Sequence, residues 1–161
     1  MSKIDLYIHE ISISSSAVNI EDQVCQILAQ IYIDKQRGLE KYDDVNNLMP
    51  TIKDVKVKIG ERRLTFRCHN GWRYVNKRKS TVLGAPNKLG LYSADGSVSL
   101  TDFMPHDHCA VVVELEFKAH VVGDSDRETS ICMGYNIFMP VIDKGQLPEQ
   151  TTSIKLLKGP S

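Results

Sequence analysis

The fold of this chain is decided by the stretch Asp107-His108-Cys109-Ala110-Val111-Val112-Val113-Glu114-Leu115-Glu116-Phe117. Five of its residues, 109–113, are apolar without a break, and glutamates then alternate with apolar residues. Valine and phenylalanine favour a strand over a helix, because branched and aromatic side chains pack well on a pleated surface. The stretch therefore predicts a central β-strand whose second half has one face in water.

Shorter segments on both sides of this stretch also alternate apolar and polar residues. They predict strands at residues 4–13, 55–59, 63–68, 98–100, 131–139 and 153–157. Within residues 4–13 the alternation slips by one residue, which predicts a β-bulge. Turns are expected at Gly60-Glu61, Asn70-Gly71 and 94–97, because glycine and asparagine tolerate positive φ.

The segment 25–33 is compatible with two structures. Its apolar residues have helical spacing when counted from Val24, and they alternate when counted from Cys25. The ending Ile31-Tyr32-Ile33 favours a strand. Together these segments predict an all-β fold, an antiparallel β-sandwich of about seven to eight strands with at most one short helix, in a single domain of residues 1–161.

The composition excludes several broad classes of function. The chain has 161 residues, 42% of them hydrophobic, which is sufficient for the core of one domain. Its 20 Lys and Arg balance 20 Asp and Glu, so no overall field attracts nucleic acid, and nucleic-acid binding is not expected. No apolar run approaches the roughly 18 residues of a membrane-spanning helix. The spacing of the cysteines predicts reduced core thiols of an intracellular protein rather than disulfides, at Cys25, Cys68, Cys109 and Cys132.

Candidate metal ligands and nucleophiles are few. The run His106-Asp107-His108-Cys109 contains zinc-type ligands, but strand alternation points Cys109 away from the histidines, and no Cys-x-x-Cys pair is present. Burial at Cys109 also disfavours the thiolate that a nucleophile needs. Too few loop carboxylates gather for calcium, the candidates being Asp102, Asp107, Asp124 and Asp126. We therefore predict no enzyme activity, no metal site and no cofactor.

The most uneven feature is a basic segment at residues 62–79. Its members are Arg62, Arg63, Arg67, His69, Arg73, Lys77, Arg78 and Lys79, with Trp72 and Tyr74 among them. Such a segment is typical of a surface for acidic protein, anionic lipid or phosphate, although a hairpin face in water can have the same composition. Adjacent cations outside a regular element repel one another, so a partner is expected at residues 77–79. The candidate partner-binding residues are Arg67, Trp72, Arg73, Lys77, Arg78 and Lys79.

Several segments, in their order and spacing, resemble a β-rich domain of the nephrocystin-4 family. They are Arg62-Arg63-Leu64-Thr65-Phe66-Arg67-Cys68-His69-Asn70-Gly71, then Cys109-Ala110-Val111-Val112-Val113-Glu114-Leu115-Glu116-Phe117, then Tyr135-Asn136-Ile137-Phe138-Met139-Pro140. The closing Lys155-Leu156-Leu157-Lys158-Gly159 resembles that family as well. The likeness covers roughly residues 61–159, and residues 1–58 are not placed in it.

The resemblance implies a C2-like β-sandwich that is part of a longer scaffold protein of the ciliary transition zone. It also implies a non-catalytic module in the cytoplasm, at the cilium or basal body, which binds ciliary scaffold proteins and, as a second partner, an anionic membrane surface. The loop aspartate clusters of calcium-binding C2 domains are missing from this sequence, so binding is expected to be calcium-independent. The alternative is a self-assembling viral or structural jelly roll, because eight-stranded sandwiches also serve there.

Overall fold

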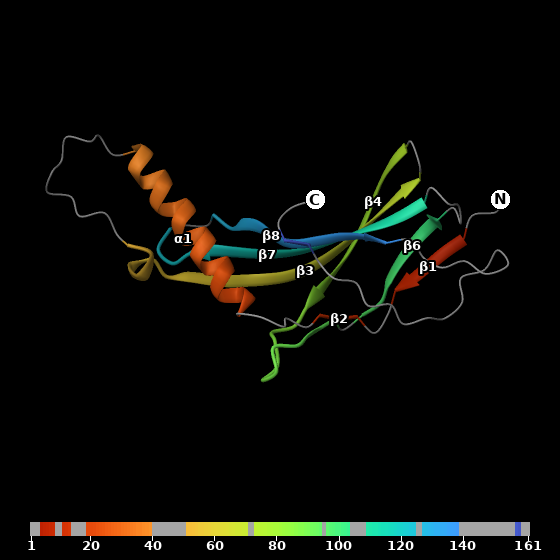
Figure 1. The fold of residues 1–161 in the computed structure, drawn as a ribbon, viewed down its shortest axis with the longest axis horizontal. Helices are drawn as coiled ribbons and strands as arrows, with labels where there is room; N and C mark the ends of the chain where they lie inside the picture. Colours follow the sequence, from red (N-terminus) through yellow and green to blue (C-terminus); the bar gives the residue numbers. More distant parts are fainter. Residues whose placement is uncertain are drawn as a thin grey trace, which may run out of the picture. The chain divides into compact units, whose positions relative to one another are not determined.

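A computed structural model describes residues 4–8, 11–13, 19–39, 51–70, 73–94, 96–103, 109–124, 127–138 and 157–158. The elements are β1 (Ile4–Ile8), β2 (Ser12–Ile13), α1 (Ile20–Leu39), the 3₁₀ helix η1 (Ile52–Asp54), β3 (Val57–Asn70), β4 (Arg73–Leu83), β5 (Tyr92–Ser93), β6 (Val98–Phe103), β7 (Cys109–Val121), β8 (Thr129–Phe138) and β9 (Leu157–Lys158) (Figure 1). Most of these residues are in strands of antiparallel sheets, which confirms the predicted all-β class.

The largest sheet has five strands in the order β4-β3-β7-β8-β9. Strand β7 lies in the middle of this order, which confirms the central strand predicted from the stretch that begins at Asp107 (Figure 1). Strand β8 is its neighbour, as expected. Two smaller antiparallel pairs, β1 with β6 and β2 with β5, complete the described strands.

Strand β7 has one dry face and one polar face. Its dry face consists of buried apolar side chains at alternate positions, Val111, Val113, Leu115, Phe117, Ala119 and Val121. Its other face changes from buried Ala110 and Val112 to the half-buried Glu114, Glu116, Lys118 and His120. This alternation follows from the period of two in a strand, and it confirms that the second half of the strand has one polar face.

The segment 25–33 is helical, so the expectation of a strand there was wrong. Helix α1 has 20 residues, and it is therefore also longer than the short helix that was allowed. The side chain of Asn19 accepts a hydrogen bond from the N–H of Glu21 at 3.0 Å, which caps the first turn. The helix buries Val24 and Leu28 and leaves Ile27 39% exposed. Burial at helical spacing thus outweighed the β propensity of the isoleucines.

Strand β3 is continuous, so the turn expected at Gly60-Glu61 does not form. Positive φ among the described glycines occurs at Gly90 and Gly123, and not at Gly60. The reversal expected near Asn70-Gly71 does occur, because Asn70 pairs with Arg73 across the β3–β4 hairpin. Residues 77–79, expected outside regular structure, lie within β4.

The remaining sequence-based expectations are met in part. The register of β1 against β6 shifts between Ile4 and Leu6, which places an irregularity earlier than the slip in the sequence pattern. The expected strand at 98–100 is β6. The turn expected at 94–97 includes residue 95, which lies outside the described residues. Of the expected strand at 153–157, only residue 157 lies within the described residues.

The chain divides into two compact units. The first consists of Met1–Ser14, Arg62–Glu116 and Cys132–Ser161, and the second of Ser15–Glu61 and Phe117–Ile131. Strands β3, β7 and β8 contribute residues to both units. Within the second unit, the described buried apolar side chains come from α1 and from the strand ends, namely Val24, Leu28, Ala29, Ile33, Phe117, Ala119, Val121 and Ile131. This set forms the core of that unit.

We predict that Phe117→Ala lowers the free energy of unfolding by about 3–5 kcal/mol, because the fully buried ring leaves a cavity. Urea denaturation followed by circular dichroism measures the loss. Val122→Ala is the control: its side chain is 55% exposed, so a change within about 0.5 kcal/mol is expected. Equal unfolding midpoints for the two variants would contradict the central role of β7.

Candidate functional site

The β3–β4 hairpin sorts the basic segment onto two faces of the sheet. Residues directly opposite each other in antiparallel strands share a face. Arg67 lies opposite Arg78, and on the other face Phe66 lies opposite Lys79. The alternate positions Arg63, Thr65, Arg67, Arg78, Ser80 and Val82 therefore form one face, which we call the polar hairpin face.

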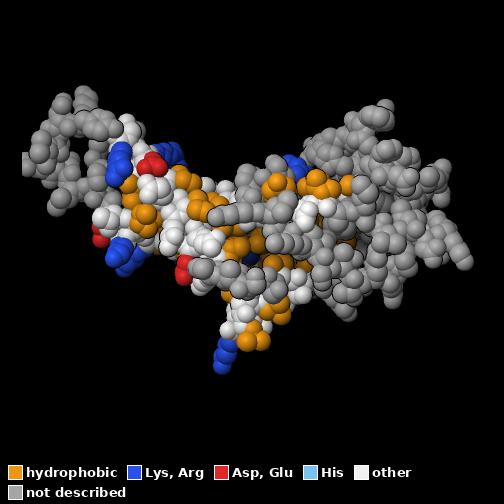
Figure 2. Space-filling model, viewed as in Figure 1, with side chains coloured by type: hydrophobic (Ala, Val, Ile, Leu, Met, Phe, Trp, Pro, Cys, Tyr) orange, Lys and Arg blue, Asp and Glu red, His pale blue; other side chains and the backbone are white. Residues whose placement is uncertain are grey.

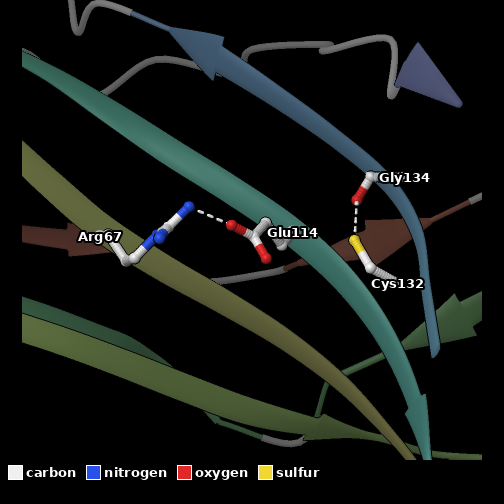
Figure 3. A network of polar contacts seen from close by, with 4 residues as sticks. All are labelled: Arg67, Glu114, Cys132 and Gly134. Carbon is white, nitrogen blue, oxygen red and sulfur yellow. Dashed lines mark hydrogen bonds and ion pairs between the residues drawn. The ribbon is translucent and has the colours of Figure 1, made fainter. Parts of the chain in front are cut away.

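An ion pair connects this face to the central strand. The guanidinium of Arg67 on β3 pairs with the carboxylate of Glu114 on β7, as Figure 3 shows. Both side chains are largely buried, with 13% and 20% of their surfaces exposed. A partly buried pair of this kind costs desolvation, so losing either partner leaves a charge without compensation in a poorly hydrated place.

Two further arginines flank this pair on the polar hairpin face. Arg63 donates a hydrogen bond from Nη1 to the hydroxyl of Ser80 at 3.1 Å, across the hairpin. Arg78 is exposed and lies directly opposite Arg67. Like charges in opposite positions are unfavourable in a sheet, and the carboxylate of Glu114 offsets part of this repulsion. The face thus carries more positive than negative charge.

A thiol lies beside the ion pair on the neighbouring strand. Cys132 on β8 contacts the carbonyl oxygen of Gly134 through its sulfur at 3.7 Å (Figure 3). Burial raises the pKa of the Cys132 thiol, and the negative charges of Glu114 and Glu116 raise it further. This thiol therefore stays protonated near neutral pH, which does not suit a nucleophile.

The structure brings together only part of the predicted partner-binding set. Arg67 and Arg78 share the polar hairpin face, with Arg67 held by Glu114, whereas the exposed Lys79 lies on the opposite face. Arg73 and Lys77 are placed in β4 by their backbone. Trp72 lies outside the described residues. Sequence reasoning missed Glu114 as the partner of Arg67, although its position on the polar side of the central strand was a usable signal.

The residues weighed for metal binding are mostly outside the description. His106, Asp107 and His108 fall outside the described residues, as does Asp126. Among the described side chains, no group of three or more His, Cys, Asp or Glu could hold a metal ion. Cys25, Cys68 and Cys132 form no disulfide among the described residues, with Cys68 buried and the other two half-buried. No helix in the described ranges has the length and apolarity needed to cross a membrane.

The antiparallel sheets and the one α-helix of the described residues are consistent with a C2-like all-β domain. The family model described as the nephrocystin-4 second C2-like domain matches residues 4–161. The chain therefore belongs to the nephrocystin-4 family, and the match extends to the N-terminal residues that the sequence resemblance left unplaced. Neither a curated protein nor a solved structure gives a significant match.

We predict that the Arg67–Glu114 pair is energetically coupled. A double-mutant cycle with Arg67→Ala and Glu114→Ala, measured by urea denaturation, should give a coupling free energy of about 1–3 kcal/mol. The more exposed Lys118–Glu61 pair, at 3.6 Å, is the matched control, and less than about 1 kcal/mol is expected there. Coupling at Arg67–Glu114 no larger than that at the control pair would contradict this picture.

The raised pKa of Cys132 predicts how the stability of the fold changes with pH. The unfolded thiol ionises before the folded one as pH rises, so this group favours folding at low pH and loses that contribution in alkaline solution. Comparison of wild type with Cys132→Ala should therefore show a steeper loss of stability for wild type above about pH 8.5. If the free energies of unfolding of wild type and Cys132→Ala change in parallel from pH 7 to alkaline pH, the raised pKa of Cys132 is contradicted.

Proposed function

We propose that this domain, residues 1–161, is a non-catalytic, calcium-independent interaction module of a ciliary or basal-body scaffold. Its partner is a protein with an acidic surface, which binds at strand β4 of the hairpin. The observation that carries the proposal is that β4, an edge strand of the five-stranded sheet, exposes the adjacent cations Arg78 and Lys79. The family supports the scaffold role and the location at the transition zone.

The arrangement of charges supports an anionic partner. Arg78 and Arg67 lie opposite each other on the polar hairpin face, and Arg63 lies on the same face. Negative charge brought to this face would reduce the repulsion among the guanidinium groups. Lys79 projects from the other face of the same strand, so a partner that grips the edge of the sheet reaches both cations. Calcium independence rests on the sequence, whose loop aspartates are not clustered.

The candidate residues differ in the roles that we propose for them. Arg67 forms an ion pair with Glu114, so we propose that it holds the polar hairpin face in place and does not contact the partner directly. Arg78 and Lys79 supply the exposed charge. Arg73, Lys77 and Trp72 are included as partner-binding residues on the sequence pattern alone, the first two for their charge and the last for its aromatic ring. The jelly-roll alternative gains no support from the family match, because that match describes a C2-like domain.

Charge reversal at Lys77→Glu, Arg78→Glu and Lys79→Glu tests the proposal in the full-length protein. We expect proximity labelling in ciliated cells to show loss of most neighbours that wild type labels, because the anionic partner is repelled. Lys88→Glu, at an exposed loop lysine, is the control with a single reversed charge. Circular dichroism must show that the variants remain folded.

Vesicles of phosphatidylserine and phosphatidylcholine separate a protein partner from a membrane. Co-sedimentation is measured at low and high salt, with and without calcium. Absent vesicle binding together with the loss of labelled neighbours supports a protein partner. If the triple charge-reversal variant labels the same neighbours as wild type, the proposed site on β4 is contradicted. If wild type binds vesicles in a salt-sensitive way and the triple variant does not, the site binds lipid instead of protein.

A further inference from the structure

Strand β3 extends beyond the strand that pairs with it. Strand β4 pairs with β3 from Arg62 to Asn70, whereas β3 already begins at Val57. The other neighbour of β3 in the sheet is β7. In the described parts of the chain, no strand pairs with the outer side of residues 57–61. We call this segment the open edge.

The backbone of the open edge presents hydrogen-bonding groups to that side. The carbonyl of Lys56 accepts a hydrogen bond from the N–H of Val122 at 2.8 Å, so it points toward the end of β7. Backbone groups of successive residues in an extended chain point to alternate sides. The N–H and C=O groups of Val57 and Ile59 therefore point outward, where the described chain supplies no strand. Such a row of groups is a template for an added strand.

The side chains of the open edge alternate in character. Lys58 is exposed, while Val57 and Ile59 are half-buried on the opposite face of the strand. Lys53 and Lys56, which precede the strand, are also exposed. Figure 2 shows Lys and Arg side chains gathered over the region where η1 lies. The open edge thus has an exposed lysine on one side and two half-buried apolar residues on the other. Its acidic residue, Glu61, forms an ion pair with Lys118 at 3.6 Å.

The start of the open edge is held by η1. The N–H and the hydroxyl of Thr51 both donate hydrogen bonds to Oδ2 of Asp54, each at 2.9 Å. These two hydrogen bonds lower the pKa of Asp54, so its charge and the cap persist at neutral pH. The N–H of Val55 then bonds the carbonyl of Ile52 at 3.3 Å. The chain enters β3 from a defined turn, so less conformational entropy is lost when a strand is added.

We propose that the open edge binds an extended segment of a partner protein as an additional strand, in which acidic residues alternate with apolar ones. An acidic residue on the Lys58 face meets opposite charge, and an apolar residue on the other face packs against Val57 and Ile59. Lysines on edge strands commonly block association with other strands. Here they select against a second copy, because edge-to-edge pairing would bring Lys56 and Lys58 of two molecules together.

This surface is separate from the proposed site on β4. It lies on residues 57–61, before the first β3 residue that pairs with β4. Its partner chemistry is also different, since it requires an extended backbone as well as negative charge. Variants at Arg78 and Lys79 are therefore expected to leave it intact, and failure of one proposal does not decide the other.

Two synthetic peptides of about ten residues test the proposal, one alternating glutamate with valine and one with the same residues in two blocks. Fluorescence anisotropy should give at least about tenfold tighter binding for the alternating peptide. Its addition should also slow the amide hydrogen exchange of Val57 and Ile59, because their N–H groups become bonded. Equal binding of the two peptides would show attraction by charge alone and overturn the proposal.

Ile59→Pro separates the backbone from the side chain. Proline removes the outward N–H without removing a bond to β7, so the domain should fold while affinity for the alternating peptide falls at least about tenfold. Ile59→Val keeps the N–H and should bind within about twofold of wild type. Lys58→Glu supplies a second loss-of-binding variant if proline disturbs the fold, with Lys88→Glu as its matched control.

Other occupants of the edge would overturn the proposal with their own signatures. Slow exchange of Val57 and Ile59 before any peptide is added would show that another segment of this chain covers the edge. Dimerisation in sedimentation equilibrium that Ile59→Pro abolishes would assign the edge to a second copy. Peptide affinity unchanged by Lys58→Glu would remove the argument from charge.

Discussion

Burial of one face of β7 is the constraint on which the rest of the structure depends. Phe117 and Ala119 are fully shielded from solvent, and Leu115 is almost so. Such burial requires cover, and α1 belongs to the same compact unit as the end of β7 that carries Phe117 and Ala119. An amphipathic helix supplies apolar surface in a continuous stripe, which a short edge strand cannot do. The apolar stripe of α1 and the buried end of β7 therefore contribute to the core of the same unit.

The opposite face of β7 sets the chemistry of the hairpin. Because Glu114 alternates with the buried row, its carboxylate lies on the face to which β3 contributes Arg67. The Arg67–Glu114 ion pair buries one positive and one negative charge together. The carboxylate also reduces the repulsion between Arg67 and Arg78. Burial raises the pKa of the neighbouring Cys132 thiol, and the charge of the same carboxylate adds to this. One glutamate thus influences both the arginines of the polar hairpin face and the thiol beside them.

The two proposed surfaces share a physical origin in the ends of strand pairing. In the part of the chain that the structure describes, β4 is the last strand of its sheet, with only an isolated bridge from Leu83 to Ala94 beyond it. Residues 57–61 are an edge because β4 pairs with β3 only from Arg62 onward. Both edges carry exposed cations, at Arg78 and Lys79 in one and at Lys58 in the other. Positive charge at an edge discourages pairing between identical molecules and leaves an acidic strand or surface as the favoured partner. We propose that this domain of the nephrocystin-4 family gains selective contacts in this way.

The central strand, its dry face and the reversal after Asn70 could all be predicted from the amino-acid order, because alternation and turn residues act over a few neighbours. The helix at Ile20–Leu39 could not be predicted, because its isoleucines fit both the helical period and the strand period. Burial in the folded unit favours the helical one. The continuity of β3 through Gly60 could not be predicted either. Glycine locally favours a turn, but pairing across the sheet keeps this residue in the strand. The same holds for the site. A run of cations is visible in the sequence, but which cation meets Glu114 and which faces water depends on strand register, and register is set by contacts between residues far apart in the chain.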